Sequence, residues 1–111
     1  MLGKAYRTAM RKHNISNNRR YFSVIETTLH TQVAMMTLAP GEASGPKHND
    51  HPGSEQVVLL LEGQLVAEVG DERTNMVAGD VLIVPTKVPH RLTNDGKIPA
   101  VTFNVYGPPA Y

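Results

Sequence analysis

Residues 79–94 read GDVLIVPTKVPHRLTN, and this stretch decides the fold. Its first half contains the aliphatic run 81–84, which Pro85 ends, and such a run is typical of a short strand. Its second half, residues 90–93, runs into the turn signal Asn94-Asp95-Gly96. Side chains on a strand alternate between two faces, so positions 90, 92 and 94 share one face. The stretch predicts two short strands with a histidine and an asparagine on the same side.

Further short runs of strand-forming residues lie on both sides of this stretch. Turn residues separate them, among them Pro40-Gly41 and Gly70-Asp71. The expected strands cover residues 21–29, 32–38, 56–61, 64–69, 73–77, 81–84, 90–93 and 101–106. Strands that recur roughly every 8–12 residues, with no helical pattern between them, indicate an all-β sandwich or barrel rather than a βαβ fold.

The size and composition are those of one globular domain without cysteine chemistry. The chain has 111 residues, of which 41% are hydrophobic and 19% charged, enough for a single core. The absence of cysteine excludes disulfides and thiolate metal sites, so any metal must bind through nitrogen and oxygen. No apolar run is long enough to cross a bilayer and no signal-peptide pattern is present. The sequence therefore predicts a soluble, cytoplasmic protein without a membrane partner.

The charge is unevenly distributed along the chain. Residues 1–20 contain six basic residues and no acidic one, whereas residues 21–111 contain five basic and ten acidic residues, a formal charge of −5. We therefore divide the chain into a basic N-terminal arm, residues 1–20, and a β-domain, residues 21–111. The arm is either solvated or packed against the acidic barrel of a partner. No recognition motif or aromatic platform accompanies the basic residues, so nucleic acid is not an expected partner.

Two segments resemble the sequence motifs of the cupin superfamily. The second cupin motif, G-x5-P-x-G-x2-H-x3-N, is matched at every position except Lys87, by Gly79, Pro85, His90 and Asn94. The latter half of the first motif, G-x5-H-x-H-x3-4-E-x6-G, is similar to residues 51–63. Fifteen residues separate the two segments, as expected for an intermotif hairpin. The resemblance covers about residues 35–106 and implies a single-domain cupin, a jelly-roll barrel also described as a double-stranded β-helix.

The resemblance also implies a metal site inside the barrel. Its residues are His51 and His90, Gln56 in the position of the motif's glutamate, and a fourth ligand that is Asn49 or His48. Asn49 stands where the motif has its first histidine, and His48 precedes it by one residue. On a regular strand Asn49 points inward together with His51, while His48 points outward; a bulge would reverse this.

The implied ligand set carries no formal charge, because glutamine replaces the glutamate. It would hold a divalent ion (Zn, Ni, Mn or Fe) less tightly than a site with a carboxylate. Such an ion polarises a substrate oxygen, which favours isomerase or lyase chemistry on a small polar metabolite over dioxygenase chemistry. The alternative is a non-catalytic small-molecule-binding or sensor protein with a vestigial metal site, in which the two histidines hydrogen-bond to each other and to water.

Three further expectations concern Lys87, the last strand and the assembly. Lys87 occupies a motif position that often needs positive φ, which costs a lysine on the order of 1 kcal/mol; the alternative is that the turn, with Pro89 nearby, has a different geometry. On the last strand, apolar residues at 101, 103 and 105 alternate with polar residues at 102, 104 and 106. We expect the apolar set to fill the barrel; in the alternative, Asn104 and Tyr106 line the pocket. A small open barrel has sheet edges to cover, which favours a homodimer.

Overall fold

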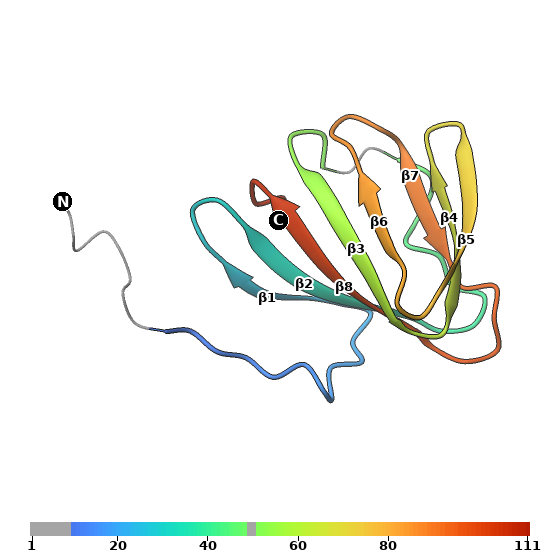
Figure 1. Ribbon diagram of the computed structural model, residues 1–111, viewed down its shortest axis with the longest axis horizontal. Helices are drawn as coiled ribbons and strands as arrows, with labels where there is room; N and C mark the ends of the chain where they lie inside the picture. Colours follow the sequence, from blue (N-terminus) through green and yellow to red (C-terminus); the bar gives the residue numbers. More distant parts are fainter. Residues whose placement is uncertain (1–9, 49–50) are drawn as a thin grey trace.

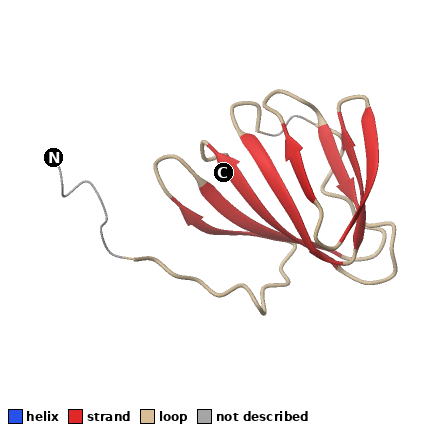
Figure 2. Cartoon of the chain, in the orientation of Figure 1, coloured by secondary structure: helices blue, strands red, loops and turns tan. Residues whose placement is uncertain are grey.

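The computed structural model describes residues 10–48 and 51–111, and its regular structure in these residues is entirely β (Figure 2). The eight strands of the described chain are β1 (Phe22–Thr27), β2 (Gln32–Leu38), β3 (Glu55–Glu62), β4 (Gln64–Val69), β5 (Glu72–Val77), β6 (Val81–Val84), β7 (His90–Thr93) and β8 (Ala100–Gly107). Each expected strand is present, with ends that differ by at most two residues. The prediction of an all-β jelly-roll barrel is confirmed.

The strands form two antiparallel sheets that pack against each other (Figure 1). The larger sheet has the order β1-β2-β8-β3-β6, and the smaller sheet has the order β5-β4-β7. Apart from the pairs β1-β2 and β4-β5, neighbouring strands come from distant parts of the sequence, as when β8 lies between β2 and β3. This non-local order brings the two motif segments, β3 and β7, to opposite walls of one barrel.

Between β3 and β4 the chain crosses from the larger sheet to the smaller one through one residue, Gly63. Gly63 has φ +84°, a left-handed conformation that L-residues with a Cβ avoid. A Cβ at this position would lie 2.6 Å from the carbonyl oxygen of Pro99. Both the backbone conformation and the close approach of the chain before β8 require glycine at this corner.

The core lies between the sheets and is built from the inward residues of both. Its fully buried aliphatic residues include Leu38, Val58 and Leu60 from the larger sheet and Leu65 and Leu92 from the smaller sheet. Burying one such side chain contributes roughly 1.5–3 kcal/mol to folding. Leu92 is thus on the inward face of β7, as its shared face with His90 and Asn94 predicted.

The prediction for the last strand is wrong, because the polar face of β8 is the buried one. Thr102 and Asn104 are fully buried and Tyr106 is 2% exposed, whereas Phe103 and Val105 lie on the outer face, partly exposed. The Thr102 hydroxyl donates to the carbonyl of Met36 (3.1 Å), and the Asn104 amide donates to the Thr102 hydroxyl (2.9 Å). These hydrogen bonds offset the cost of taking polar groups out of water. We call the inward row of Thr102, Asn104 and Tyr106 the polar ladder of β8.

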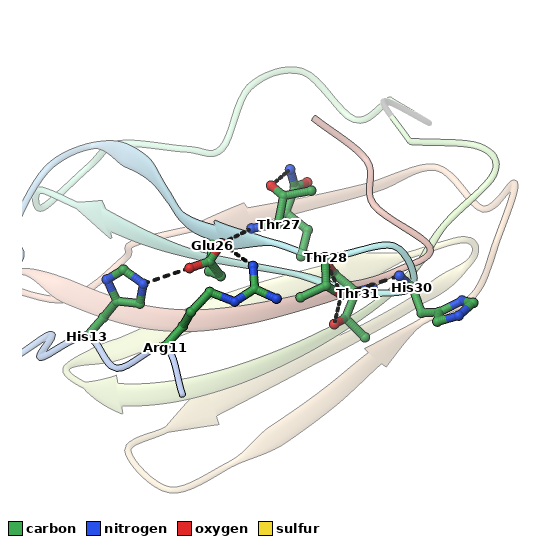
Figure 3. A network of polar contacts seen from close by, with 8 residues as sticks. Arg11, His13, Glu26, Thr27, Thr28, His30 and Thr31 are labelled. Atoms are coloured by element: carbon green, nitrogen blue, oxygen red, sulfur yellow. Dashed lines mark hydrogen bonds and ion pairs between the residues drawn. The ribbon is translucent and has the colours of Figure 1, made fainter. Parts of the chain in front are cut away.

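The described part of the basic arm runs outside β1, the edge strand of the larger sheet (Figure 1). Arg11 and His13 both contact the carboxylate of Glu26 on β1, at 3.2 and 3.0 Å (Figure 3). Arg19 pairs with Glu62 at the end of β3, at 2.6 Å. Basic residues of the arm therefore pair with acidic residues of the same chain's barrel.

Two smaller findings complete the fold. Lys87 has φ +63°, and among the described residues it is the one non-glycine with a positive φ, as its place in the motif led us to expect. The described residues contain no helix long and apolar enough to span a membrane.

Candidate metal site

His51 and His90 meet inside the barrel, although they are far apart in the sequence. His51 lies in the loop before β3 and is 4% exposed, and His90 is the first residue of β7. Their Nε2 atoms are 3.1 Å apart, and the ring centroids are separated by 4.6 Å. The fold thus brings together the two histidines that the motifs single out.

Gln56 completes this group from the second position of β3. Its Oε1 atom lies 2.9 Å from Nε2 of His51. Its Nε2 atom donates to Oδ1 of Asn104 at 2.9 Å and to the hydroxyl of Tyr106 at 3.3 Å. Because both donor hydrogens of the amide are directed at β8, its oxygen is held toward the histidines. The polar ladder of β8, which the sequence analysis placed on the wrong face, is what orients this side chain.

Backbone carbonyls fix the proton positions on both imidazoles. Nδ1 of His51 lies 3.3 Å from the carbonyl oxygen of Ser54, and Nδ1 of His90 lies 3.1 Å from that of Val88. A carbonyl only accepts hydrogen bonds, so it favours the hydrogen on Nδ1 of each ring, although Nε2 of His51 also contacts an acceptor, Oε1 of Gln56, at 2.9 Å. In the neutral rings, each Nε2 then presents a lone pair to the space between the histidines. Metal-binding histidines typically have this outer hydrogen bond.

The three converging atoms, two ring nitrogens and one amide oxygen, fit a divalent cation. Ligands at about 2.1 Å from an ion and at right angles to one another lie ~3.0 Å apart. The observed separations from His51 are 3.1 Å to His90 and 2.9 Å to Gln56. No group of three His, Asp or Glu side chains in the described residues could hold a metal, so a metal bound to His51 and His90 would take the Gln56 oxygen as its third described protein donor.

The two alternatives for the fourth ligand have different outcomes. His48 forms a backbone bridge with His90, in which the His90 N–H donates to the His48 carbonyl at 2.9 Å. The His48 side chain is exposed, and the structure does not bring it into the cluster of His51, His90 and Gln56. Asn49 lies outside the described residues.

A cavity of about 250 Å³ opens next to the histidines. Besides the site residues and Tyr106, its lining includes Tyr21, Phe22 and Tyr111. The sequence analysis did not identify these three aromatic residues, since they lie outside both motifs. Tyr111 reaches the cavity because Gln32, which is 1% exposed, accepts hydrogen bonds from the backbone N–H groups of Ala110 and Tyr111.

Comparison with known proteins assigns the chain to a family. The sequence pattern of the cupin domain matches residues 34–106, well over half of the chain. The chain belongs to the cupin domain family. Within this cupin, the matched region contains His51, Gln56 and His90, together with the whole polar ladder of β8.

Curated relatives of this cupin are longer proteins with different names. The tetracenomycin polyketide synthase protein TcmJ of Streptomyces glaucescens is 36% identical over 69 residues, which cover 61% of this chain and 45% of the relative. The auxin-binding protein ABP19b of Prunus persica is 30% identical over 87 residues, 74% of this chain and 41% of the relative. The chain thus spans less than half the length of these relatives.

Solved structures confirm the barrel of this cupin. BH2720 from Bacillus halodurans superposes with a TM-score of 0.84 at 23% identity, covering 94% of this chain and 85% of that protein. TT1209 from Thermus thermophilus superposes with a TM-score of 0.77 at 28% identity, covering 89% of this chain and 98% of that protein. The first likeness shows the fold alone, and neither protein's name states a function.

Proposed function

We propose that this cupin binds a divalent metal ion through His51, His90 and Gln56 and uses it to act on a small polar metabolite. One observation carries the proposal: two imidazole Nε2 atoms lie 3.1 Å apart while both Nδ1 atoms contact backbone carbonyls. Two lone pairs that face each other repel, and a cation between them removes the repulsion. Zn, Ni, Mn and Fe all accept imidazole nitrogen, so the donor set leaves the identity of the ion open.

A bound divalent ion would supply Lewis-acid polarisation of a substrate carbonyl, carboxylate or hydroxyl oxygen. The protein's own residues hold the site: Asn104 orients the Gln56 amide, and the Tyr106 hydroxyl accepts its second hydrogen bond. Tyr106 also lines the cavity, so its hydroxyl is the candidate group for proton exchange with a bound molecule. The neutral donor set leaves the charge of an ion uncompensated, which suits isomerase or lyase chemistry better than dioxygenase chemistry.

A second candidate is a non-catalytic binding or sensor protein. It is favoured by the lining of the cavity, because no carboxylate that could act as a general base is among its described lining residues. In this case the histidine pair would be a vestige of a metal site. The relatives do not decide between the two, since their names point to polyketide synthesis in one case and auxin binding in the other.

Metal uptake by purified protein separates the two candidates. Elemental analysis of wild-type protein is expected to find about one divalent ion per chain, and added metal is expected to raise the melting temperature of chelator-treated protein. The variant His90→Ala should lose both effects. His48→Ala, which removes an exposed histidine outside the cluster, should retain them. If wild-type protein contains no metal, and no added metal changes its melting temperature, the result would support the non-catalytic binding or sensor protein instead.

We also propose that the partner of this chain is a second copy of itself. The outer face of the larger sheet carries two rows of apolar residues that cross four strands in register. One row is Ile83, Val57, Val105 and Val33, and the other is Val81, Leu59, Phe103 and Met35. Met35 is already buried within the chain, whereas Val81 and Ile83 remain 60% and 50% exposed. Because such a face favours burial and two-fold pairing is the commonest assembly, a homodimer is expected.

Light scattering tests this assembly. Wild-type protein should have the mass of two chains, and the double variant Val81→Lys/Ile83→Lys should have the mass of one. Both side chains are on an exposed edge strand, so the variant should remain folded. A wild-type mass of one chain would contradict the proposal.

A further inference from the structure

Aromatic side chains gather at the cavity beside the histidines. The chain has six phenylalanine and tyrosine residues, and four of them line this cavity: Tyr21, Phe22, Tyr106 and Tyr111. They come from opposite ends of the sequence, from the start of β1 and from the end of β8 and the segment after it. The buried hydrophobic cluster of the core consists of aliphatic residues and methionine, so the concentration of rings at one opening calls for a functional explanation.

Three of these rings, those of Phe22, Tyr106 and Tyr111, contact one another and form what we call the aromatic cage. Tyr111 is tilted against Phe22 with centroids 4.9 Å apart, and it meets Tyr106 edge to face at 5.2 Å. Tyr106 in turn meets the imidazole of His51 at 5.1 Å with an interplanar angle of 72°. These are the separations and angles at which aromatic groups attract each other. The cage therefore extends without interruption from the mouth of the cavity to the metal site.

A buried amide holds the outermost ring in place. Oε1 of Gln32 accepts from the backbone N–H of Ala110 at 3.1 Å and of Tyr111 at 2.8 Å. Nε2 of Gln32 donates to the carbonyl of Tyr111 at 2.7 Å and to the Thr27 hydroxyl at 2.8 Å. All hydrogen-bonding groups of this glutamine are used, three of them on the segment that carries Tyr111. Tyr111 is 56% exposed, yet its backbone is fixed at the mouth of the cavity.

The rest of the lining is uncharged and divides into two ends. None of the described residues that line the cavity is Lys, Arg, Asp or Glu. The buried residues Met36 and Leu92 supply an apolar wall, while His51, His90 and Gln56 supply the polar end. A phosphate or a second carboxylate would find no lysine or arginine partner in this described lining. A volume of about 250 Å³ leaves room for one or two fused rings.

From this arrangement we infer that the ligand of the cavity is a flat, uncharged aromatic molecule with one oxygen, a phenol or an enol. Its ring lies among Phe22, Tyr106 and Tyr111, and its oxygen points to His51, His90 and Gln56. The ring part of this inference stands on the cage alone, and only the contact of the oxygen with an ion rests on the proposed function.

Binding of 2-naphthol, measured by calorimetry and by its own fluorescence, tests the inference. The comparison compounds are decahydro-2-naphthol, which keeps the carbon skeleton and hydroxyl but is saturated, and glucose 6-phosphate. Chelator-treated protein should bind 2-naphthol at least tenfold more tightly than either compound. Tyr111→Ala should weaken 2-naphthol binding roughly two- to tenfold, since it removes one ring of the cage. Val77→Ala, which shortens an exposed apolar side chain on β5 away from the cavity, should leave the affinity unchanged.

The two proposals fail in different ways. Equal binding of 2-naphthol and its saturated analogue, tighter binding of glucose 6-phosphate, or unchanged affinity in Tyr111→Ala would each overturn the aromatic ligand, whatever metal is bound. Tight and ring-selective binding that is the same in metal-treated and chelator-treated protein would support the aromatic ligand while counting against the role of the ion.

Discussion

Nε2 of His51 and Nε2 of His90 face each other across 3.1 Å, and each ring has its other nitrogen on a backbone carbonyl. These carbonyl contacts favour the hydrogen on Nδ1 of each ring, which leaves both Nε2 atoms available to bind an ion. Gln56 adds an oxygen at 2.9 Å from His51, and its amide is oriented by β8. The site is therefore built by its surroundings as much as by its three donors, and the predictions below address those surroundings.

Asn104 should act as a positioning residue for Gln56. Asn104→Leu leaves one amide hydrogen of Gln56 without its acceptor, so Gln56 is free to rotate its oxygen away from His51. We expect divalent metal affinity to fall roughly 10- to 100-fold, and the free energy of unfolding to fall by about 1–3 kcal/mol. Calorimetric metal titration and urea unfolding measure the two effects. The control Asn75→Leu, at an exposed position of β5, should change neither.

Lys87→Gly should stabilise the protein. A lysine at φ +63° is strained, whereas glycine adopts this conformation without strain. The relief of this strain exceeds the entropic cost that glycine adds by making the unfolded chain more flexible. We expect the free energy of unfolding to rise by about 0.5–1 kcal/mol in urea denaturation. Lys97→Gly, at an exposed position without positive φ, should lower it slightly. A loss of stability in Lys87→Gly would show that the lysine side chain has a role its conformation does not reveal.

Gly63→Ala should be far more damaging than Gly79→Ala. Both glycines have positive φ, +84° and +98°, so both substitutions strain the backbone. Only at Gly63 does the new methyl group also meet a backbone atom, the Pro99 oxygen at 2.6 Å, while nothing lies within 4 Å at Gly79. Expected losses in the free energy of unfolding are about 2–4 kcal/mol for Gly63→Ala and about 1–2 kcal/mol for Gly79→Ala. If thermal or urea unfolding shows equal losses of unfolding free energy for the two variants, the backbone at Gly63 must be able to shift and make room for the methyl group.

The attachment of the arm to β1 should weaken in acid. The hydrogen bond from His13 lowers the pKa of Glu26 below its ordinary value of 4.5; desolvation opposes this shift, and the charge of Arg11 adds to it. A carboxyl with a lower pKa in the folded protein stabilises the fold above the unfolded pKa, and the contribution disappears as pH falls through the folded value. The contribution is thus fully present at neutral pH, and it is lost as the pH falls below 4.5 through the lower pKa that Glu26 has in the folded protein.

Carbon-13 NMR titration of the Glu26 carboxyl measures this directly. Its midpoint should lie below 4.5 in wild-type protein and should move up in His13→Ala and, to a smaller extent, in Arg11→Met. A wild-type midpoint at the ordinary value, or one that His13→Ala leaves in place, would show that the arm does not hold Glu26 in solution.

The sequence predicted the strands and the two histidines because their signals are local. Turn residues mark each strand end, and strand alternation puts Leu92 and Asn94 on the inward face with His90. Asn94 shows why the motif needs this residue: its buried amide donates to the carbonyls of Leu38 and Ile98, at 2.9 and 2.8 Å, and ties the end of β7 to two other segments.

The polar face of β8 and the aromatic cage were beyond such reasoning. Alternation shows that residues 102, 104 and 106 share a face but not which face is inside, and hydrophobicity alone favours the wrong choice. The inward choice depends on partners such as Met36, 66 residues from Thr102. The backbone of Tyr111 is held at the cavity by Gln32, 79 residues away in the sequence. These are pairings between distant segments, which a pattern of neighbours does not contain.

A crystal structure of the cobalt-soaked protein, with an anomalous difference map, tests the metal site most directly. The account predicts one strong peak per chain at ~2.0–2.3 Å from Nε2 of His51, Nε2 of His90 and Oε1 of Gln56. An empty position between these three atoms, with cobalt absent or bound only at exposed histidines such as His48, would contradict it.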